Sequence, residues 1–360
     1  MEPEAKPNVT EYYALGASRP ESRKLPVSQP LVPALVSDLY DVYWLFAAER
    51  HNVFIRRLRS LPPPWTADPI LLTFKFTNAY RVLDRVSQYL IRSVIYRADL
   101  PDTSAEICFR ILLFKIFNKI ETWQRLERAF GSITLAGYDF YKYDEAFKSA
   151  LAAGDPIYSG AYIMPPGGSS YGFSAKHQNH LRLIEAIITS GFPDRIRHCR
   201  TMQQVFLLLR GFPTIGDFLA YQLTTDINYS TLTNFAEMDF VVPGPGARDG
   251  IRKCFTHSGG LNDAELIKIV ADRQESELAR LGLSFPSLWG RRLQLIDCQN
   301  LFCEVSKYTR VAYPSAKGLA GRTKIKQRFR AGRDMYNVWL PPKWGLNERI
   351  AADPHLTARY

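Results

Sequence analysis

A glycine-bearing hairpin is the part of this sequence best suited to holding an anion. Residues 209–220 read LRGFPTIGDFLA, with apolar stretches on both sides of the glycines. Glycine tolerates positive φ, so we expect Gly216 to turn the chain sharply into a second helix. The free N–H groups at the start of that helix favour an anion, and no side chain blocks its approach. The sequence therefore predicts a phosphate-binding turn at Gly211, Thr214, Ile215 and Gly216, with a plain helix–turn–helix corner as the alternative.

Asp239, which follows the hairpin, is the candidate catalytic group. It lies between Met238 and Phe240, and we expect these neighbours to shield it partly from solvent. A carboxylate in such a place stabilises an oxocarbenium-like sugar, and it can also deprotonate an attacking water. In one alternative, Asp239 caps the next turn or forms an ion pair with Arg248 or Arg252. In another, the catalytic acid is Asp226 or Glu237.

A run of cations near the C-terminus is a second candidate for phosphate contacts. Residues 317–333 contain no acid, and several glycines keep the segment flexible. Lysine and arginine that neutralise DNA phosphates give an affinity that falls with salt. We predict DNA contacts at Lys324, Lys326, Arg328 and Arg330. A solvated segment, or one docked on the protein's own acids, is the alternative.

Composition and charge indicate which partners and which cellular compartment to expect. The 360 residues include 46 Lys and Arg against 35 Asp and Glu, a net charge of +11 that favours polyanionic partners. The five cysteines are scattered, as in a reducing compartment. His177 and His180 lie three apart, but no third ligand is evident, so we expect no metal site. Without a signal peptide or a spanning segment, we expect a cytoplasmic protein that does not bind membranes and is a monomer.

The apolar periodicity predicts a mostly α fold that positions these groups. Helical patterns cover 38–59, 77–97, 104–130, 138–153, 175–189, 263–281 and 285–308, whereas alternating strand patterns are nearly absent. We expect one compact helical body, either undivided or with two lobes. The predicted domains are a flexible N-terminal arm at 1–36, a helical catalytic domain at 37–315, and a basic C-terminal extension at 316–360 that packs back on the body.

The order helix, glycine hairpin, helix and Asp239 resembles the helix-hairpin-helix DNA glycosylase superfamily. The resemblance implies that the hairpin holds a DNA phosphate while Asp239 stabilises the sugar cation formed as a base leaves. Bifunctional members carry a nucleophilic lysine just after the hairpin glycine, where this sequence has Asp217 and Phe218. A monofunctional enzyme that leaves an abasic site is therefore expected. Family analogy suggests a monovalent cation at the hairpin and no other cofactor.

Four separated blocks, at 74–85, 113–123, 235–251 and 295–304, carry a narrower resemblance. They are similar to the helical domain of alpha-glutamyl/putrescinyl thymine pyrophosphorylases, also named for 5-hydroxymethyluracil DNA kinases. The resemblance covers about residues 40–310, and it implies a pyrimidine substrate with a bulky 5-substituent, as in phage DNA. No Gly-x-x-x-x-Gly-Lys-Ser/Thr loop is present in the sequence, which disfavours a kinase.

An enzyme of this kind needs a pocket for a flipped base, with polar groups that read its edge and aromatic walls. Asn78 and Arg81, and likewise Asn118 and Glu121, are spaced three apart and are the candidate readers. A buried polar network between core helices is the alternative for these four residues. Tyr162, in the glycine-, tyrosine- and proline-rich loop 158–173, offers a stacking face.

Together these features predict a monofunctional DNA glycosylase, a hydrolase that flips a bulky 5-modified pyrimidine out of double-stranded DNA and excises it. Glucosylated 5-hydroxymethylcytosine is one such base, and excising it would serve defence against phages. Two alternatives stay open. One is a transferase or pyrophosphorylase that modifies 5-hydroxymethyl pyrimidines without cutting the glycosidic bond. The other is a DNA-binding module without catalysis.

Overall fold

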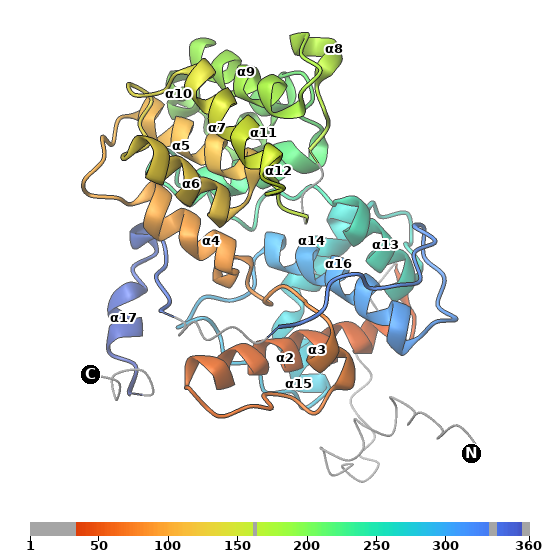
Figure 1. Cartoon of the computed structure of the whole chain (residues 1–360). Coiled ribbons are helices and arrows are strands. Elements are labelled where there is room, and N and C mark those ends of the chain that lie inside the picture. The colour runs from red at the N-terminus through yellow and green to blue at the C-terminus, as the bar shows by residue number, and fades with distance from the viewer. Residues whose placement is uncertain (1–33, 161–163, 331–336, 355–360) are drawn as a thin grey trace, which may run out of the picture. The chain divides into compact units, whose positions relative to one another are not determined.

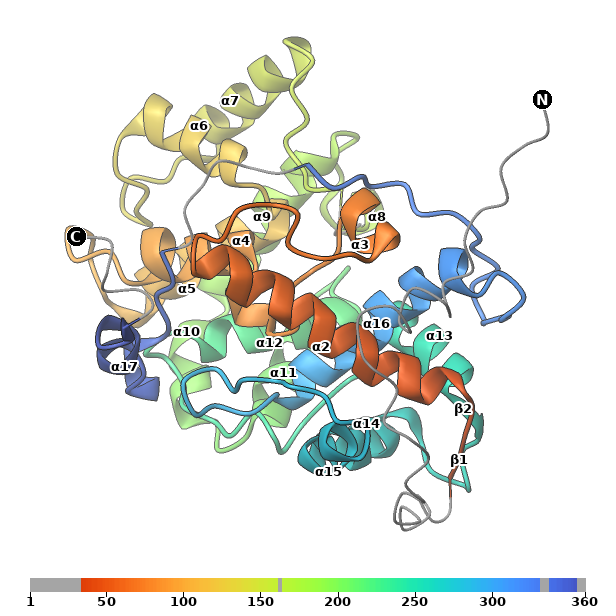
Figure 2. The same ribbon diagram turned by 90° about the horizontal axis from the view of Figure 1, so that it is seen from below.

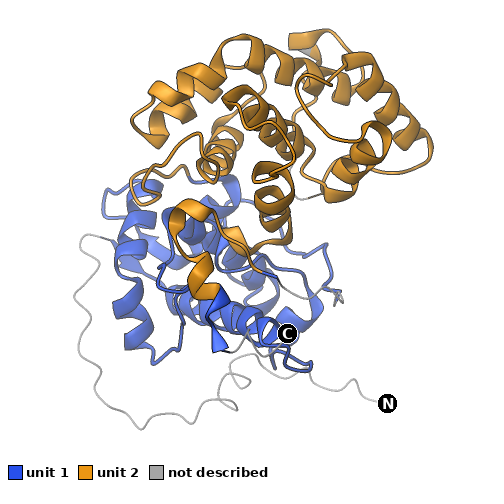
Figure 3. Cartoon of the chain, turned by 90° about the vertical axis from the view of Figure 1, so that its left-hand side faces the viewer, with its two compact units in different colours: residues 1–81, 243–337, 351–360 blue, residues 82–242, 338–350 orange. Residues whose placement is uncertain are grey.

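The computed structural model describes residues 34–160, 164–330 and 337–354, and these are mostly helical (Figure 1). The predicted all-α class is confirmed. The chain divides into two compact units, coloured separately in Figure 3. Unit 1 takes its described residues from 34–81, 243–330, 337 and 351–354, and unit 2 from 82–160, 164–242 and 338–350. Each unit thus combines distant stretches of the chain, and the predicted domain limits at 36 and 315 stay predictions.

The helices and strands of unit 1 are β1 (Leu35–Val36), α2 (Leu39–Leu58), α3 (Pro69–Thr73), α13 (Pro245–Cys254), β2 (Phe255–His257), α14 (Asp263–Asp272), α15 (Gln274–Arg280) and α16 (Leu295–Ala312). Those of unit 2 are α4 (Arg85–Tyr89), η2 (Leu90–Ile95), α5 (Ser104–Phe117), α6 (Ile120–Phe130), α7 (Phe140–Ala152), α8 (Gly168–Tyr171), α9 (Lys176–Thr189), α10 (Phe192–Arg195), η3 (Ile196–His198), α11 (Met202–Arg210), α12 (Asp217–Asn228) and η4 (Pro342–Trp344). Two short helices, η1 (Arg81–Leu83) and α17 (Asn347–Ala351), span the unit limits.

Helices α13 and α16 form the centre of unit 1. They pack so closely that a Cβ added at Gly250 would overlap the Phe302 carbonyl, and one at Gly246 would overlap the Cys303 side chain. Glycine is therefore required at Gly250 by the close approach of the two backbones, whereas at Gly246 the space for a Cβ is taken by the side chain of Cys303. A buried hydrogen bond also joins these two helices: the Lys253 ammonium donates to the Ser306 carbonyl at 3.0 Å.

Strand β1 precedes α2 in the chain and forms a two-stranded antiparallel sheet with β2. Leu35 pairs with His257 and Val36 with Phe255, and Figure 2 shows β1 and β2 side by side. These two residues of β1 lie at the end of the segment predicted to be a flexible arm, so that prediction is wrong for them. Residues 1–33 of the arm lie outside the described residues.

Helix α5 is the central helix of unit 2, and it is buried on nearly all sides, as its continuous apolar pattern predicts. Thr103 caps it by accepting a hydrogen bond from the Glu106 N–H. The predicted single helix over 104–130 is wrong, because Asn118 adopts the left-handed conformation with φ 50°. That conformation ends α5, and the chain restarts as α6 in a new direction.

Two other predicted helices begin later than expected. The pattern over 77–97 forms a loop up to Tyr80, then η1, α4 and the π-helical η2. The pattern over 285–308 is helical only from Leu295, where Gln294 and Asp297 form a reciprocal cap. The segment 263–281 divides into α14 and α15 at Arg273. Apolar side chains in these loops are buried as they would be in helices, which explains the misleading periodicity.

None of the helices in the described ranges combines the length and the hydropathy of a membrane-spanning segment.

Candidate functional site

Asp239 lines an open cleft of unit 2. The cleft has a volume of about 260 Å³ and lies between the start of α11 and the loop that follows α12. Its lining residues are Arg200, Thr201, Met202, Gln203, Asn234, Phe235, Ala236, Asp239 and Phe240. Besides Thr201, whose hydroxyl caps α11 by accepting from the Gln204 N–H, three exposed polar side chains accompany the carboxylate: those of Arg200, Gln203 and Asn234. The cleft thus offers a cation, two amides and an acid to a ligand, with Phe235 and Phe240 as apolar walls.

The predicted shielding of Asp239 is wrong, because its side chain is exposed. Within the described part of the chain, its carboxylate has no ion-pair partner. Arg248 and Arg252, the alternative partners, lie in unit 1 and face Asp263, at 4.0 and 2.9 Å respectively. Asp239 is therefore accessible to a substrate that carries an acidic or hydroxyl proton.

Both competing carboxylates are buried. Asp226 is fully buried on α12, and its carboxylate lies 3.4 Å from the ammonium of Lys115 on α5. Glu237 is only 6% exposed. A buried acid beside a buried lysine is suited to holding two helices together, whereas an exposed acid in a cleft can meet a ligand. Asp239 is the one of the three acids that a ligand in the cleft can reach.

The loop that carries Asp239 is anchored by polar contacts that sequence reasoning missed. Asn228, 1% exposed at the end of α12, accepts hydrogen bonds at 2.9 Å from the Thr233 hydroxyl and from the Phe235 N–H. The ammonium of Lys343 donates to the carbonyl oxygens of Asn228, Ser230 and Thr233. Nothing in the local sequence around Lys343 signals this role, since its acceptors lie more than a hundred residues away.

Phe240 fixes the other end of the same loop. Its ring packs against Phe206 of α11 and Tyr221 of α12, with ring centroids 5.3 and 5.9 Å apart. The Tyr221 hydroxyl donates to the Phe240 carbonyl at 3.4 Å. The hairpin helices therefore position Asp239 through its neighbour in the chain.

The hairpin is formed by α11 and α12, as predicted, but its turn differs from the prediction. Thr214 has the positive φ, 69°, whereas Gly216 has φ −80° and ψ 173°. The expectation of a left-handed Gly216 is therefore wrong. A Cβ added at Gly216 would meet nothing within 4 Å, and Gly216 is exposed. Neither φ nor packing against described residues requires glycine there, which leaves the backbone open to a ligand.

The other predicted phosphate-binding residues are partly covered. Ile215 is 1% exposed, and the Thr214 hydroxyl is shielded from solvent, with no hydrogen-bond partner among the described residues. Gly211 is exposed with φ −71°, at the end of α11. Arg210 forms an ion pair with Asp217, so an acid already lies in the first turn of α12. A phosphate would meet that acid, and only the backbone groups are positioned to receive it.

The four predicted base readers do not form one site. Asn118 is buried and accepts a hydrogen bond from the Lys115 ammonium at 2.8 Å. Glu121 is exposed and pairs with Arg85 at 3.1 Å, so it does not share a face with Asn118. Asn78 and Arg81 are 5% and 3% exposed and belong to unit 1. The geometry therefore favours the alternative of a buried polar network for Asn118, whereas Asn78 and Arg81 are buried and Glu121 lies on the surface.

The loop that contains Tyr162 is described only in part, and Tyr162 itself lies outside the described residues. The rest of the loop packs on α9 and on the hairpin. A Cβ added at Gly167 would lie 3.3 Å from Asn179 and 3.4 Å from Thr214. Gly167 has φ 70°, so both its backbone and its packing favour glycine.

The two histidines of α9 are structural. His177 shares a hydrogen bond with Asp144 at 2.7 Å. In His180, one ring nitrogen accepts from the Tyr158 hydroxyl at 2.8 Å and the other donates to the Pro165 carbonyl at 2.7 Å. Burial lowers the pKa of His180 to about 4, so the ring is neutral at physiological pH. No group of three or more His, Cys, Asp or Glu side chains is placed to hold a metal in the described ranges.

The basic segment lies in unit 1, and its described cations are exposed. Lys324, Lys326, Arg328 and Arg330 are all exposed, and none forms an ion pair within the described residues. The alternative of a segment docked on the protein's own acids is supported by one contact among the described residues, in which the Ala320 N–H donates to the Asp249 carboxylate at 2.8 Å. The cations themselves remain available to a polyanion.

Comparison with known proteins identifies the family. Residues 37–318 match the family model described as the helical domain of 5-hmdU DNA kinase. A protein named 5-hmdU DNA kinase, from Bacillus phage SP10, is 27% identical over 326 residues. The match covers 82% of this chain and 50% of the relative, so the chain spans about half the length of that curated protein. No solved structure matches the chain with significance.

These findings correct the main functional expectation. Both matches carry the name of a DNA kinase, a transferase, so the expected DNA glycosylase and its hydrolase class are wrong. The wider resemblance to the helix-hairpin-helix glycosylases is not shown by either match. The narrower resemblance is confirmed: the chain belongs to the family of 5-hmdU DNA kinase helical domains.

Proposed function

We propose that this chain binds DNA containing a 5-hydroxymethyl pyrimidine and takes part in transferring a group to the 5-hydroxymethyl oxygen. The glycosidic bond stays intact. The observation that carries the proposal is the family match over residues 37–318, together with the name of the phage relative. A nucleoside triphosphate is the donor that the word kinase implies for that relative, and phosphoryl is then the group transferred.

The exposed carboxylate of Asp239 is suited to the acceptor side of such a reaction. The hydroxymethyl oxygen forms a bond to the terminal phosphorus of the donor, and the bond from that phosphorus to the leaving diphosphate oxygen breaks. Asp239 accepts the hydroxyl proton as general base, a role that a carboxylate plays in other phosphoryl transfers. The cleft volume of about 260 Å³ suits a flipped base, with Gln203 and Asn234 as candidates for reading its polar edge.

We assign the contacts with DNA phosphates to two parts of the protein. Lys324, Lys326, Arg328 and Arg330 form an exposed set of cations in unit 1, and the open backbone at Gly216 starts α12 in unit 2. Cations supply affinity without sequence preference, and helix starts attract single phosphates. Recognition of the modified base itself is left to the Asp239 cleft.

The test uses matched DNA duplexes that contain a single thymine, 5-hydroxymethyluracil or 5-hydroxymethylcytosine. Each duplex is incubated with the full chain and ATP and then digested, and the nucleosides are analysed by mass. We expect a phosphate-sized mass gain on a hydroxymethyl nucleoside only, with no alkali-labile site. Alkali-labile sites in place of the mass gain would contradict transfer.

Two variants test whether the transfer takes place in the cleft. Asp239→Asn removes the proton acceptor but keeps the shape, so we expect transfer to fall by about a hundredfold or more while DNA binding stays unchanged. Asp194→Asn is the matched control, because Asp194 is also an exposed acid of unit 2. Equal activity of the two variants would remove Asp239 from the mechanism.

A second candidate is a DNA-binding module that presents the modified base to a catalytic domain outside these 360 residues. The observation that favours it is the missing Gly-x-x-x-x-Gly-Lys-Ser/Thr pattern in the 360-residue sequence. In that case the chain alone transfers nothing, yet it binds hydroxymethyl DNA more tightly than thymine DNA. Equal affinity for the two DNAs would contradict this second candidate.

A further inference from the structure

In the basic segment of unit 1, the backbone of residues 327–329 is paired with that of residues 73–75. The Phe329 N–H donates to the Thr73 carbonyl at 2.9 Å, and the Lys75 N–H donates to the Gln327 carbonyl at 3.0 Å. Phe74 and Arg328 thereby form an antiparallel bridge. This pairing fixes the backbone around Arg328, where the sequence alone predicts a flexible segment.

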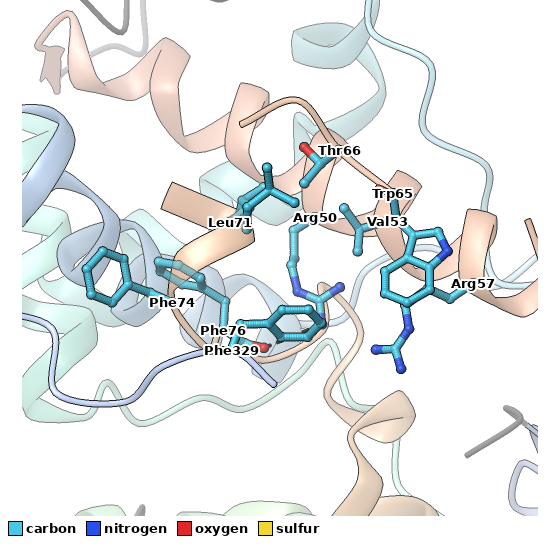
Figure 4. Close-up of a pocket in the computed structure, with 10 residues that line it drawn as sticks. Arg50, Val53, Arg57, Trp65, Thr66, Leu71, Phe74, Phe76 and Phe329 are labelled. Carbon is cyan, nitrogen blue, oxygen red and sulfur yellow. Dashed lines mark hydrogen bonds between the residues drawn. The ribbon is translucent and has the colours of Figure 1, made fainter. Parts of the chain in front are cut away.

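The same segment is anchored in a small pocket with largely aromatic walls, which we call the aromatic notch. Phe329 lies in a group of side chains from α2 and the segment 65–76, and Figure 4 shows it among Arg50, Phe74 and Phe76. The guanidinium of Arg57 lies 5.9 Å from the centre of the Phe329 ring and 4.8 Å from that of Trp65. The space left in the notch is about 30 Å³, room for roughly one water. The notch is therefore occupied by Phe329 itself and has no room for a nucleobase.

Anchoring through Phe329 directs the cations outward. Successive side chains of an extended chain point to opposite sides, so positions 324, 326, 328 and 330 share one side and 325 and 329 share the other. Ile325 and Phe329 are half-buried and the four cations are exposed, in line with this alternation, whereas Gln327, on the side of Phe329, is exposed as well. Side chains on one side of a strand lie about 6.6 Å apart, close to twice the roughly 3.4 Å of helix axis per phosphate of one DNA strand.

We propose that residues 324–330 form a pre-organised phosphate-binding strand that follows the backbone of one DNA strand, with Phe329 as its anchor. The four cations have no acidic partner within the described residues, so their charge is available to phosphates. The inference rests on the proposed function only in taking DNA as the partner. If Phe329 holds the cations in place, DNA affinity depends on this uncharged side chain, which a purely electrostatic interaction would not predict.

The first experiment compares two triple variants of the full chain on a short unmodified duplex, with affinity measured over a range of salt concentrations. Lys324→Ala, Lys326→Ala and Arg330→Ala together should weaken binding at least about tenfold and lower the steepness of the log–log salt dependence by about 2.7. The control combines Arg128→Ala, Lys142→Ala and Lys268→Ala, three exposed cations elsewhere. The same loss in both triples would overturn the proposal.

The second experiment changes the anchor and leaves the charge alone. Phe329→Ala should lower both the affinity and the salt dependence, because the strand is no longer held, whereas Phe329→Leu should keep most of both. Thermal unfolding of each variant separates loss of the anchor from loss of the fold. A folded Phe329→Ala protein with unchanged salt dependence would overturn the proposal. Because the duplex is unmodified, these results can be read even if no preference for hydroxymethyl bases is found.

Discussion

Two aspartates of unit 2, one in its core and one in its cleft, show how burial divides one residue type between two roles. Asp226 is 0% exposed and faces the ammonium of Lys115, which also donates to Asn118. Asp239 is exposed at the rim of an open cleft and has no ion-pair partner within the described residues. The first carboxylate joins α5 to α12, and the second is free to meet a ligand.

The same difference separates the polar groups around these two aspartates. In the core, each of Lys115, Asn118 and His180 has protein partners, so these groups define the geometry of the helices. In the cleft, Arg200, Gln203 and Asn234 are exposed. Polar groups satisfied inside the protein support the fold, whereas groups left to solvent are available for recognition. Substitutions in these two sets of polar groups should therefore change the free energy of unfolding by different amounts.

Asp226→Asn should cause the largest loss of stability. The change leaves Lys115 buried without its opposite charge, which costs about 3–5 kcal/mol of unfolding free energy. The matched change Asp239→Asn should alter stability by less than about 0.5 kcal/mol, because that side chain is exposed. Denaturant unfolding of both variants measures the difference. Equal unfolding free energies of the two variants would show that burial does not give these two aspartates different roles in stability.

Acid should destabilise unit 2 through His180. Burial lowers the pKa of this ring to about 4 in the folded protein, against about 6.5 in an unfolded chain. The unfolded state therefore binds more protons between these values, so stability is complete above about pH 6.5 and is lost as the pH falls towards 4. The loss amounts to about 3 kcal/mol. Unfolding free energies measured across this pH range report the slope.

The variant His180→Asn sharpens this test, because asparagine does not titrate. It should flatten part of the acid slope, and the slope that remains comes in part from His51, whose pKa burial also lowers to about 4. His198→Asn is the control, since His198 is exposed. An unchanged slope in His180→Asn would exclude this ring as the source.

Lys343→Met should have a smaller effect on stability and a distinct effect on the cleft. It removes the donor to three carbonyl oxygens of the loop that leads to Asp239, which costs about 2 kcal/mol. The loosened loop should also weaken discrimination between hydroxymethyl and thymine DNA, measured by competition binding. Lys268→Met, at an exposed position, is the control and should change neither quantity. Discrimination at the level of the unchanged chain would show that the loop is not held by Lys343.

Local signals predicted much of the fold, and they failed where the chain bends. The stripe over 38–59 became α2, and Asp68 caps α3 by accepting from the Ile70 N–H at 2.7 Å. The predicted helix over 104–130 breaks at Asn118, because apolar residues continue on both sides of a left-handed residue that the pattern does not reveal. Periodicity reports which residues are buried, and it does not report whether the backbone between them is helical.

For the candidate site, local signals found the groups but not their partners. The hairpin at 209–220, Asp239 and the cations of 324–330 are visible as short runs of residues. The exposure of Asp239, the partners of Asn118 and Glu121, and the clamp by Lys343 depend on residues far away in the chain. No property of Asp226 or Asp239 in the sequence distinguishes the buried acid from the exposed one.

The sequence by itself determined the all-α class, the helix-to-helix hairpin, the net positive charge and the family, since these follow from composition, periodicity and the order of short blocks. Only the tertiary structure decided which carboxylate is available, which polar residues are buried networks, and that the basic segment is held along 73–75 by Phe329. The physical reason is that burial and hydrogen bonding are properties of pairs of distant residues. A chain has such pairs only after it has folded.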